Sequence, residues 1–220
     1  MKTRALIPIR AGSKGIPNKN MKEMCGKPLC YWVIDAALGA KSVDEVWVST
    51  DYDEDIVGHI EPCLGVRVLY RPAWLATDTA TSDDVLRHFC WSECEPDDVV
   101  VMLQATSPLT TGKDIDGAVD KSTKHDSLLS VVNPRCCFYW DEDGCPINYN
   151  PSTRPFRGEI KKICMENGAI YITSAGACMR GEPRIWGDTG MYMMPPETAT
   201  EIDTPEDWDI VEKLLEARLS

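Results

Sequence analysis

The sequence has 220 residues, of which 43% are hydrophobic, and this size predicts one domain, residues 1–220, with a core of its own. The formal net charge of -12 argues against nucleic acid as a partner, because phosphate backbones are bound by broad basic surfaces. The longest apolar runs fall far short of the roughly 18 residues that span a bilayer, and no basic-then-apolar segment opens the chain, so we expect neither membrane insertion nor export.

Strand and helix patterns alternate along the chain, which predicts an α/β fold with a largely parallel sheet between layers of helices. Strands are expected at residues 5–9, 45–49, 67–69, 99–104, 128–132, 169–173 and 191–194. Helices are expected at residues 29–40, near 53–61, from a cap at Thr81 or Ser82 to residue 94, and at 114–122 and 205–218. Residues 133–159 show no clean period, so we interpret them as an inserted arm.

A glycine-rich loop, RAGSKGIPNKN, follows the first expected strand at residues 10–20. Loops at the carboxyl ends of sheet strands face ligands. Gly12 and Gly15 let backbone N–H groups approach phosphate oxygens, while Arg10, Lys14 and Lys19 supply positive charge for a triphosphate. The loop matches neither the ATP-type phosphate loop nor the dinucleotide fingerprint. Phosphate binding is therefore favoured over the alternative, a turn with unrelated lysines.

Charge and cysteine patterns support the same interpretation. Residues 1–27 carry seven basic side chains and one acid, so a local cationic pocket on an acidic body is expected, although a solvated basic stretch would give the same pattern. Ten cysteines form no CxxC pair and match no zinc spacing, which favours reduced thiols in a cytoplasmic protein. The three histidines lie far apart in the sequence, and we assign them no function.

Four further segments accompany the loop in a fixed order: RPAWLATDTATS at 71–82, LQATSPL at 103–109, NGAIYI at 167–172 and EIDTPEDW at 201–208. Together the five segments resemble the acylneuraminate cytidylyltransferases, the CMP-sialic acid synthetases, over almost the whole chain. The resemblance implies a three-layer Rossmann-like nucleotidyltransferase fold and a homodimer formed through the arm at 133–159. It also implies transfer of CMP from CTP to the anomeric hydroxyl of a nonulosonic acid, an acidic nine-carbon sugar, with release of pyrophosphate.

On the nucleotide side, the resemblance assigns the triphosphate to Arg10, Ser13, Lys14 and Lys19, and the ribose to Asn20.

The same resemblance assigns the cytosine to Arg71, Ser82 and the backbone near Ala80. A planar guanidinium and a hydroxyl that both donates and accepts suit a pyrimidine edge. The alternative is that Arg71 pairs with a surface acid and Ser82 caps a helix.

Asp203 and Glu201 resemble the family's metal-binding acids, and residues two apart on a strand share one face. The resemblance implies Mg²⁺, with Mn²⁺ as a substitute, held between these carboxylates and the substrate phosphates. The alternative is that Asp203 caps the last helix. Arg10, Lys19 and Asp203 are the expected catalytic residues, since phosphoryl transfer is accelerated mainly by positioning and charge.

On the sugar side, the resemblance points to Gln104, Arg157 and Tyr171, with the fork of Arg157 on the sugar carboxylate. The chain departs from the family at Cys136, where members carry a lysine, and at the GEIKK stretch after Arg157. The sugar therefore stays open among N-acetylneuraminic acid, KDN, legionaminic acid, pseudaminic acid and Kdo, of which the LQATSPL segment disfavours Kdo. The alternative class is a non-catalytic nucleotide-binding protein. The expected location is cytoplasmic, or nuclear in a eukaryote.

Overall fold

The computed structural model describes residues 1–13, 15–53, 57, 65–77, 79–134, 138–156, 158–160 and 162–220. A seven-stranded sheet forms its centre, in the order β5-β4-β1-β6-β8-β7-β9. The strands are β1 (Thr3–Pro8), β4 (Glu45–Thr50), β5 (Arg67–Tyr70), β6 (Val99–Leu103), β7 (Ser127–Val132), β8 (Met165–Ser174) and β9 (Thr189–Met194). Among the described strands of this sheet, only the pairs that involve β8 are antiparallel, so the mostly parallel sheet expected from the sequence is confirmed.

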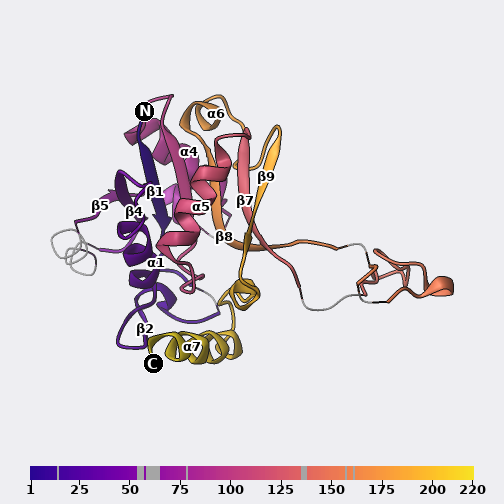
Figure 1. Cartoon of the computed structure of the whole chain (residues 1–220). Coiled ribbons are helices and arrows are strands. Elements are labelled where there is room, and N and C mark those ends of the chain that lie inside the picture. The colour runs from indigo at the N-terminus through magenta and orange to yellow at the C-terminus, as the bar shows by residue number, and fades with distance from the viewer. Residues whose placement is uncertain are drawn as a thin grey trace.

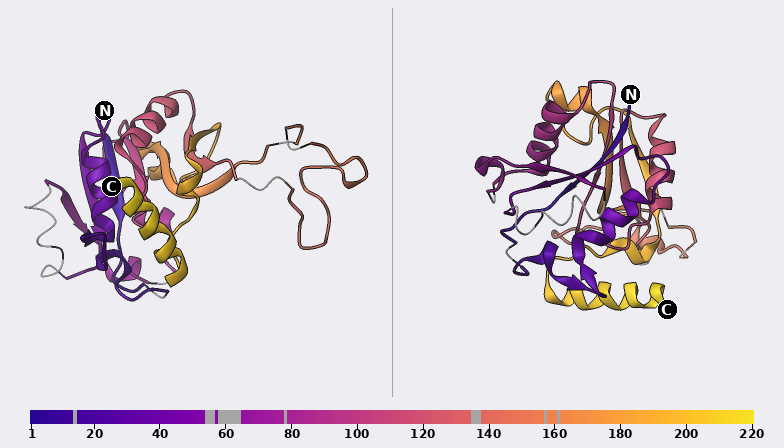
Figure 2. Two further views of the ribbon diagram at one scale, coloured as in Figure 1. Left: turned by 60° about the horizontal axis from the view of Figure 1, so that its bottom comes forward. Right: turned by 90° about the vertical axis from the view of Figure 1, so that its left-hand side faces the viewer.

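Helices cover both faces of this sheet (Figure 1, Figure 2). The helices α1 (Leu29–Leu38) and α5 (Gly112–Ser122) contact each other on one face, and α4 (Ser82–Glu93) and α6 (Ala175–Met179) contact each other on the other. Alternate residues of β1 enter two different cores: Ala5 and Ile7 pack with α1 and α5, and Leu6 packs with α4 and α6. The three-layer architecture follows from this period of two.

A third apolar cluster lies where the C-terminal helix α7 (Pro205–Leu219) meets the small hairpin of β2 (Glu23–Met24) and β3 (Lys27–Pro28). Figure 1 shows α7 below the sheet, at the end toward which β1 points. Ile16 and Ile202 are both buried in this cluster. It therefore joins the glycine-rich loop to the segment that precedes α7.

Threonine caps fix the starts of three helices. The side chains of Thr81, Thr111 and Thr204 each accept the N–H of an aspartate three residues later, whose carboxylate binds back to the cap N–H. Such caps contribute about 1 kcal/mol each. Of the two caps expected for α4, Thr81 is the one used. The helix expected near 53–61 lies outside the described residues except for Asp53 and Val57.

Residues 138–156 extend away from the body of the molecule (Figure 1, Figure 2). Their rings pack on one another: the centroid of Tyr149 lies 4.6 Å from that of Phe138 and 5.7 Å from that of Trp140. The guanidinium of Arg154 lies 4.2 Å from the Phe138 ring. The arm expected at 133–159 thus has an aromatic cluster of its own, and its role in dimerisation stays a prediction.

Two expectations from composition can be compared with the described part of the chain. None of its helices combines the length and the apolar character needed to cross a membrane. Seven of its cysteines are free thiols, in keeping with the reduced state that the sequence favours.

Candidate active site

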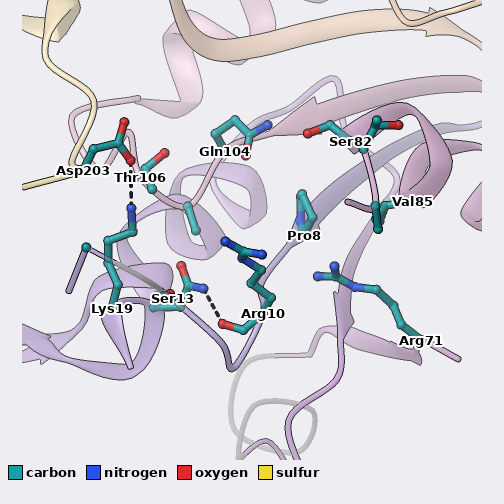
Figure 3. Close-up of a pocket in the computed structure, with 15 residues that line it drawn as sticks. Pro8, Arg10, Ser13, Lys19, Arg71, Ser82, Val85, Gln104, Thr106 and Asp203 are labelled. Carbon is teal, nitrogen blue, oxygen red and sulfur yellow. Dashed lines mark hydrogen bonds and ion pairs between the residues drawn. The ribbon is translucent and has the colours of Figure 1, made fainter. Parts of the chain in front are cut away.

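A cavity of about 470 Å³ opens at the carboxyl ends of the central strands. After β1 the chain continues to β4 on one side of the sheet, and after β6 it continues to β7 and β8 on the other side. The cavity lies between these two diverging connections, which is the usual ligand position in open α/β sheets. It is lined by Pro8, Arg10, Ser13, Gly15, Lys19, Asn20, Arg71, Ala80, Thr81, Ser82, Val85, Gln104, Ala105, Thr106 and Asp203. Figure 3 shows Arg10 between two groups, Lys19 with Asp203 on one side and Arg71 on the other.

The glycine-rich loop is held at both ends by hydrogen bonds. Asn20 is buried, and its Nδ2 donates to the carbonyl oxygen of Arg10 at 3.0 Å. The N–H of Ala11 donates to Oδ1 of Asp51 at 3.1 Å. Since Asp51 directly follows β4, the strand paired with β1, the sheet itself brings this carboxylate to the loop. These contacts fix the backbone from which Arg10 reaches the cavity.

Lys19 connects the loop to the segment before α7. Its Nζ donates to the carbonyl oxygen of Ile202 and to Oδ1 of Asp203, the latter at 3.1 Å. The Lys19 side chain is 12% exposed, whereas that of Asp203 is 74% exposed and open to a ligand. The N–H of Ile202 donates to the carbonyl oxygen of Thr106 at 3.3 Å, which ties the segment to the loop after β6. Because Thr204 caps α7, Asp203 is not the cap of that helix.

The Arg71 side chain is held by the backbone rather than by a surface acid. Its guanidinium donates to the carbonyl oxygens of Ile9 and Ser49, the second at 2.7 Å. Burial lowers the pKa of Arg71 to about 10, which leaves it charged at neutral pH. Its Nε is buried without a hydrogen-bond partner in the described part of the chain. A rigid, incompletely paired guanidinium is suited to a ligand with acceptor atoms on a planar edge.

The expected acidic pair lies in an irregular connection, not on a strand, between the turn η4 (Pro196–Ala199) and α7. The Glu201 carboxylate packs against the α-carbon of Gly168, where an added β-carbon would overlap its Oε1. Burial raises the pKa of Glu201, and the negative charges of Asp203 and Glu166 raise it further. A divalent cation would relieve the repulsion between Glu201 and Asp203. Two carboxylates leave coordination positions for water and phosphate, so these residues fit Mg²⁺.

Of the three residues expected to bind the sugar, Gln104 is the one that the structure shows in the cavity lining. Gln104 lines the cavity, and its N–H donates to the carbonyl oxygen of Ala169 at 3.2 Å. Tyr171 does not line it: the side chain is buried in the core, and its hydroxyl donates to Oε1 of Glu166. Burial and this hydrogen bond raise the pKa of Tyr171. Arg157 lies outside the described residues, so its role and that of Tyr171 in sugar binding stay predictions.

Three other expected residues stand as follows. Lys14 lies outside the described residues. Gly12 belongs to the loop but not to the cavity lining, and Glu201 is also absent from that lining.

Sequence reasoning did not single out every residue that lines the cavity. Those missed are Pro8, Thr81, Val85, Ala105 and Thr106, together with the loop-fixing Asp51. Ala105 and Thr106 fall within the LQATSPL segment, which already pointed to the site, although Gln104 was the one residue of that segment predicted to bind. Thr81 lies in the 71–82 segment but was considered only as a helix cap, and Asp51, which bonds through its carboxylate, belongs to none of the five segments.

Comparison with known proteins gives the family. A family model for cytidylyltransferases matches residues 4–168. The chain belongs to the cytidylyltransferase family. The resemblance deduced from the five segments is thereby confirmed. The match covers the glycine-rich loop, Arg71, Ser82 and Gln104, and ends before Asp203.

Relatives extend the match to the rest of the chain. N-acylneuraminate cytidylyltransferase A of Danio rerio is 37% identical over 218 residues, which cover 95% of this chain and 50% of that protein. N-acylneuraminate cytidylyltransferase of Streptococcus agalactiae serotype V is 33% identical over 220 residues, which cover 94% and 52%. This cytidylyltransferase chain therefore spans about half the length of the curated relatives it matches.

Solved structures agree on the fold. CMP:2-keto-3-deoxy-manno-octonic acid synthetase, complexed with CTP, superposes with a TM-score of 0.72 at 18% identity, over 99% of this chain and 100% of the other. 4-Diphosphocytidyl-2C-methyl-D-erythritol synthase from Anaerococcus prevotii superposes with a TM-score of 0.66 at 12% identity, over 98% of each chain. At these identities the likeness establishes the fold alone and nothing about the substrate.

Proposed function

We propose that this chain transfers CMP from CTP to the anomeric hydroxyl of a nonulosonic, sialic-type acid and releases pyrophosphate, with Mg²⁺ as cofactor. The observation that carries the proposal is the cavity in which Arg10 and Lys19 face Asp203. Membership of the cytidylyltransferase family supports the transfer of a cytidylyl group. Relatives named N-acylneuraminate cytidylyltransferases support the class of sugar.

CTP would lie along the cavity from Arg71 to Lys19. Arg71 and Ser82 would read the cytosine at one side, because both line the cavity there and both carry hydrogen-bond donors. Arg10, in the middle, would face the phosphate nearest the ribose. Lys19, at the far side, would bind the outer phosphates next to Asp203. This order places the reacting phosphorus close to Gln104, the sugar-side residue of the cavity.

The reaction needs little covalent chemistry from the protein. The anomeric oxygen forms a bond to the α-phosphorus of CTP and loses its proton to water, while the bond from that phosphorus to the bridging oxygen of the β-phosphate breaks. Pyrophosphate departs with the bonding electron pair. Mg²⁺, held by Asp203 with Glu201 nearby, would neutralise charge on the phosphate oxygens, and Mn²⁺ would substitute for it. Arg10 and Lys19 would stabilise the negative charge that grows during the transfer.

The arm offers a surface for a second copy of the chain. Within it, Phe156 is 83% exposed, Ile147 58% and Trp140 51%. Large apolar side chains on a projecting segment favour contact with a partner, and aromatic residues are enriched at interfaces. We therefore infer a homodimer formed through residues 138–156. Light scattering at micromolar concentration should give twice the chain mass of 24.5 kDa, and a monomer would contradict the inference.

The test of the proposed reaction is a pyrophosphate-release assay with CTP, Mg²⁺ and each of N-acetylneuraminic acid, KDN, legionaminic acid, pseudaminic acid and Kdo. We expect release with at least one nine-carbon acid and loss of at least 100-fold with Lys19→Ala, since one cation at the phosphates is removed. Lys41→Ala, which removes a lysine that is not part of the cavity, is the matched control. Calorimetric binding of CTP without turnover on any sugar would favour the non-catalytic alternative.

A further inference from the structure

Strand β8 carries a bulge next to the cavity. Where β7 and β8 change register, one residue of β7, Ser130, lies opposite residues 167–170 of β8. Gly168 adopts a φ of 66°, in the left-handed region that favours glycine. Bulges redirect side chains and are common beside active sites. Here the bulge directs the side chain of Asn167 into the interior, where the residue is 1% exposed.

The amide of Asn167 is fully paired in what we call the Asn167 network: Asn167, Ser130, Ile170, Met194 and Thr198. Oδ1 of Asn167 accepts from the Ser130 hydroxyl at 2.6 Å, and that hydroxyl oxygen accepts the N–H of Ile170 at 2.9 Å. Nδ2 donates to the carbonyl oxygen of Thr198 at 3.2 Å and to its Oγ1 at 3.1 Å. It also lies 3.3 Å from the sulfur of Met194. Buried polar networks of this kind fix one local geometry.

The network holds the segment that supplies the acidic pair. Thr198 is the buried residue of η4, and the chain continues from there through Glu201 to Asp203. The next residue of the bulge, Gly168, contacts the Glu201 carboxylate, so Asn167 and Gly168 fix the same segment at two successive points. The backbone N–H of Gln104 donates to the carbonyl oxygen of Ala169, the third residue of the bulge. One bulge thus sets the relative positions of the cation side and the sugar side of the cavity.

A role in folding alone would not require this arrangement. Besides its contact with the Met194 sulfur on β9, Nδ2 of Asn167 donates to two oxygen atoms, and both belong to Thr198, in the turn that leads into Asp203. We propose that Asn167 and Thr198 are positioning residues that hold the Glu201–Asp203 segment in place for the divalent cation. The inference rests on the proposed function, because it takes the cation at Asp203 from there.

The test uses Thr198→Val, which removes the hydroxyl and keeps the branched shape of the side chain. Thr173→Val is the matched control: Thr173 lies on β8, is equally buried, and its Oγ1 accepts from Nε1 of Trp186 at 3.0 Å. Thr198→Ser keeps the hydroxyl and serves as the rescue variant. The readout is the Kd for Mn²⁺ with CTP present, measured from the electron paramagnetic resonance signal of free Mn²⁺. Melting temperatures are recorded for all variants.

We expect Thr198→Val to raise the Kd for Mn²⁺ about 10-fold, the lower end of effects seen when a group that orients a metal ligand is lost. Thr198→Ser should stay within about twofold of the parent protein. Thr173→Val should lower the melting temperature by a similar amount but leave the Kd unchanged. If Thr198→Val does not fold, Thr198→Ala removes the same hydroxyl and carries the same expectation.

Two results would overturn the inference: an unchanged Kd in Thr198→Val, or equal weakening in Thr173→Val. Failure of the proposed function would look different. If Asp203→Asn bound Mn²⁺ as tightly as the parent protein, the cation would not lie at Asp203 and the proposed reaction would lose its cofactor site. If Asp203→Asn lost Mn²⁺ while Thr198→Val kept it, only the positioning role would be wrong.

Discussion

The close approach of the glycine-rich loop to the acidic segment can be tested with a single methyl group. Gly15 lines the cavity, and a β-carbon added to it would overlap the carbonyl oxygen of Asp203 and lie 3.3 Å from the carbonyl carbon. The overlap with the Asp203 carbonyl group is the contact that an alanine at position 15 would have to relieve.

Relief of that overlap requires the loop or the acidic segment to move by about 1 Å. Misplacement of this size between reacting groups costs on the order of 100-fold in rate, or about 2.7 kcal/mol. We therefore expect Gly15→Ala to lower kcat/KM for CTP about 100-fold and to weaken Mn²⁺ binding. Steady-state pyrophosphate release measures the first quantity, and Mn²⁺ titration measures the second.

Gly12→Ala provides the comparison within the same loop, because no atom of the described residues lies within 4 Å of its added β-carbon. We expect this variant to keep the melting temperature and the Mn²⁺ affinity of the parent protein. The reasoning would be refuted if Gly15→Ala retained kcat/KM within about threefold, since the structure leaves no room for its methyl group without displacement.

Three further predictions follow from buried groups. Arg71→Lys should raise the Kd for CTP about 10-fold by calorimetry, because Nη2 of Arg71 alone binds both carbonyl oxygens and a lysine has no second nitrogen left to face the ligand. Burial alone would raise the pKa of Asp98, but backbone N–H donors and Arg4 lower it below the ordinary value. The ionised Asp98 therefore stabilises the folded protein at every pH above the unfolded pKa of about 4, and this stabilisation is lost as the pH falls further. Asp98→Asn should flatten that loss in urea titrations below about pH 4. Ile202→Ala should cost about 3 kcal/mol of unfolding free energy, since Ile202 is fully buried, and a cost below about 1 kcal/mol would contradict its place in the core.

The nucleotide half of the site could be predicted because its residues follow strands that the sequence marks clearly. The apolar run of β1 ends directly at the glycine-rich loop, and the period of two within it already separates the two cores. Parallel strands end at one edge, so Arg10 and Gln104 had to meet there. Thr204 and Pro205 mark the start of α7 by their types alone.

The acidic side could not be predicted in the same way. The family resemblance placed Glu201 and Asp203 on one face of a strand, but the structure has both in the irregular connection between η4 and α7. The position of Glu201 depends on the absence of a side chain at Gly168, a contact between residues distant in sequence. The antiparallel direction of β8 is likewise a tertiary property, because a buried strand reads the same in either direction.

The charge distribution explains why such a site needs rigid support. On a chain with a net charge of -12, a polyanionic nucleotide is attracted only where the local positive charge exceeds the negative charge of the rest of the protein. The long side chains of Arg10 and Lys19 give this excess only while they are held together, since charges further apart than the screening length of about 8 Å act separately. Ile16 and Ile202 pack in one core beneath them and thereby hold the cationic loop against the acidic segment. The apolar cluster under α7 is in this sense part of the site, although none of its side chains needs to touch the nucleotide.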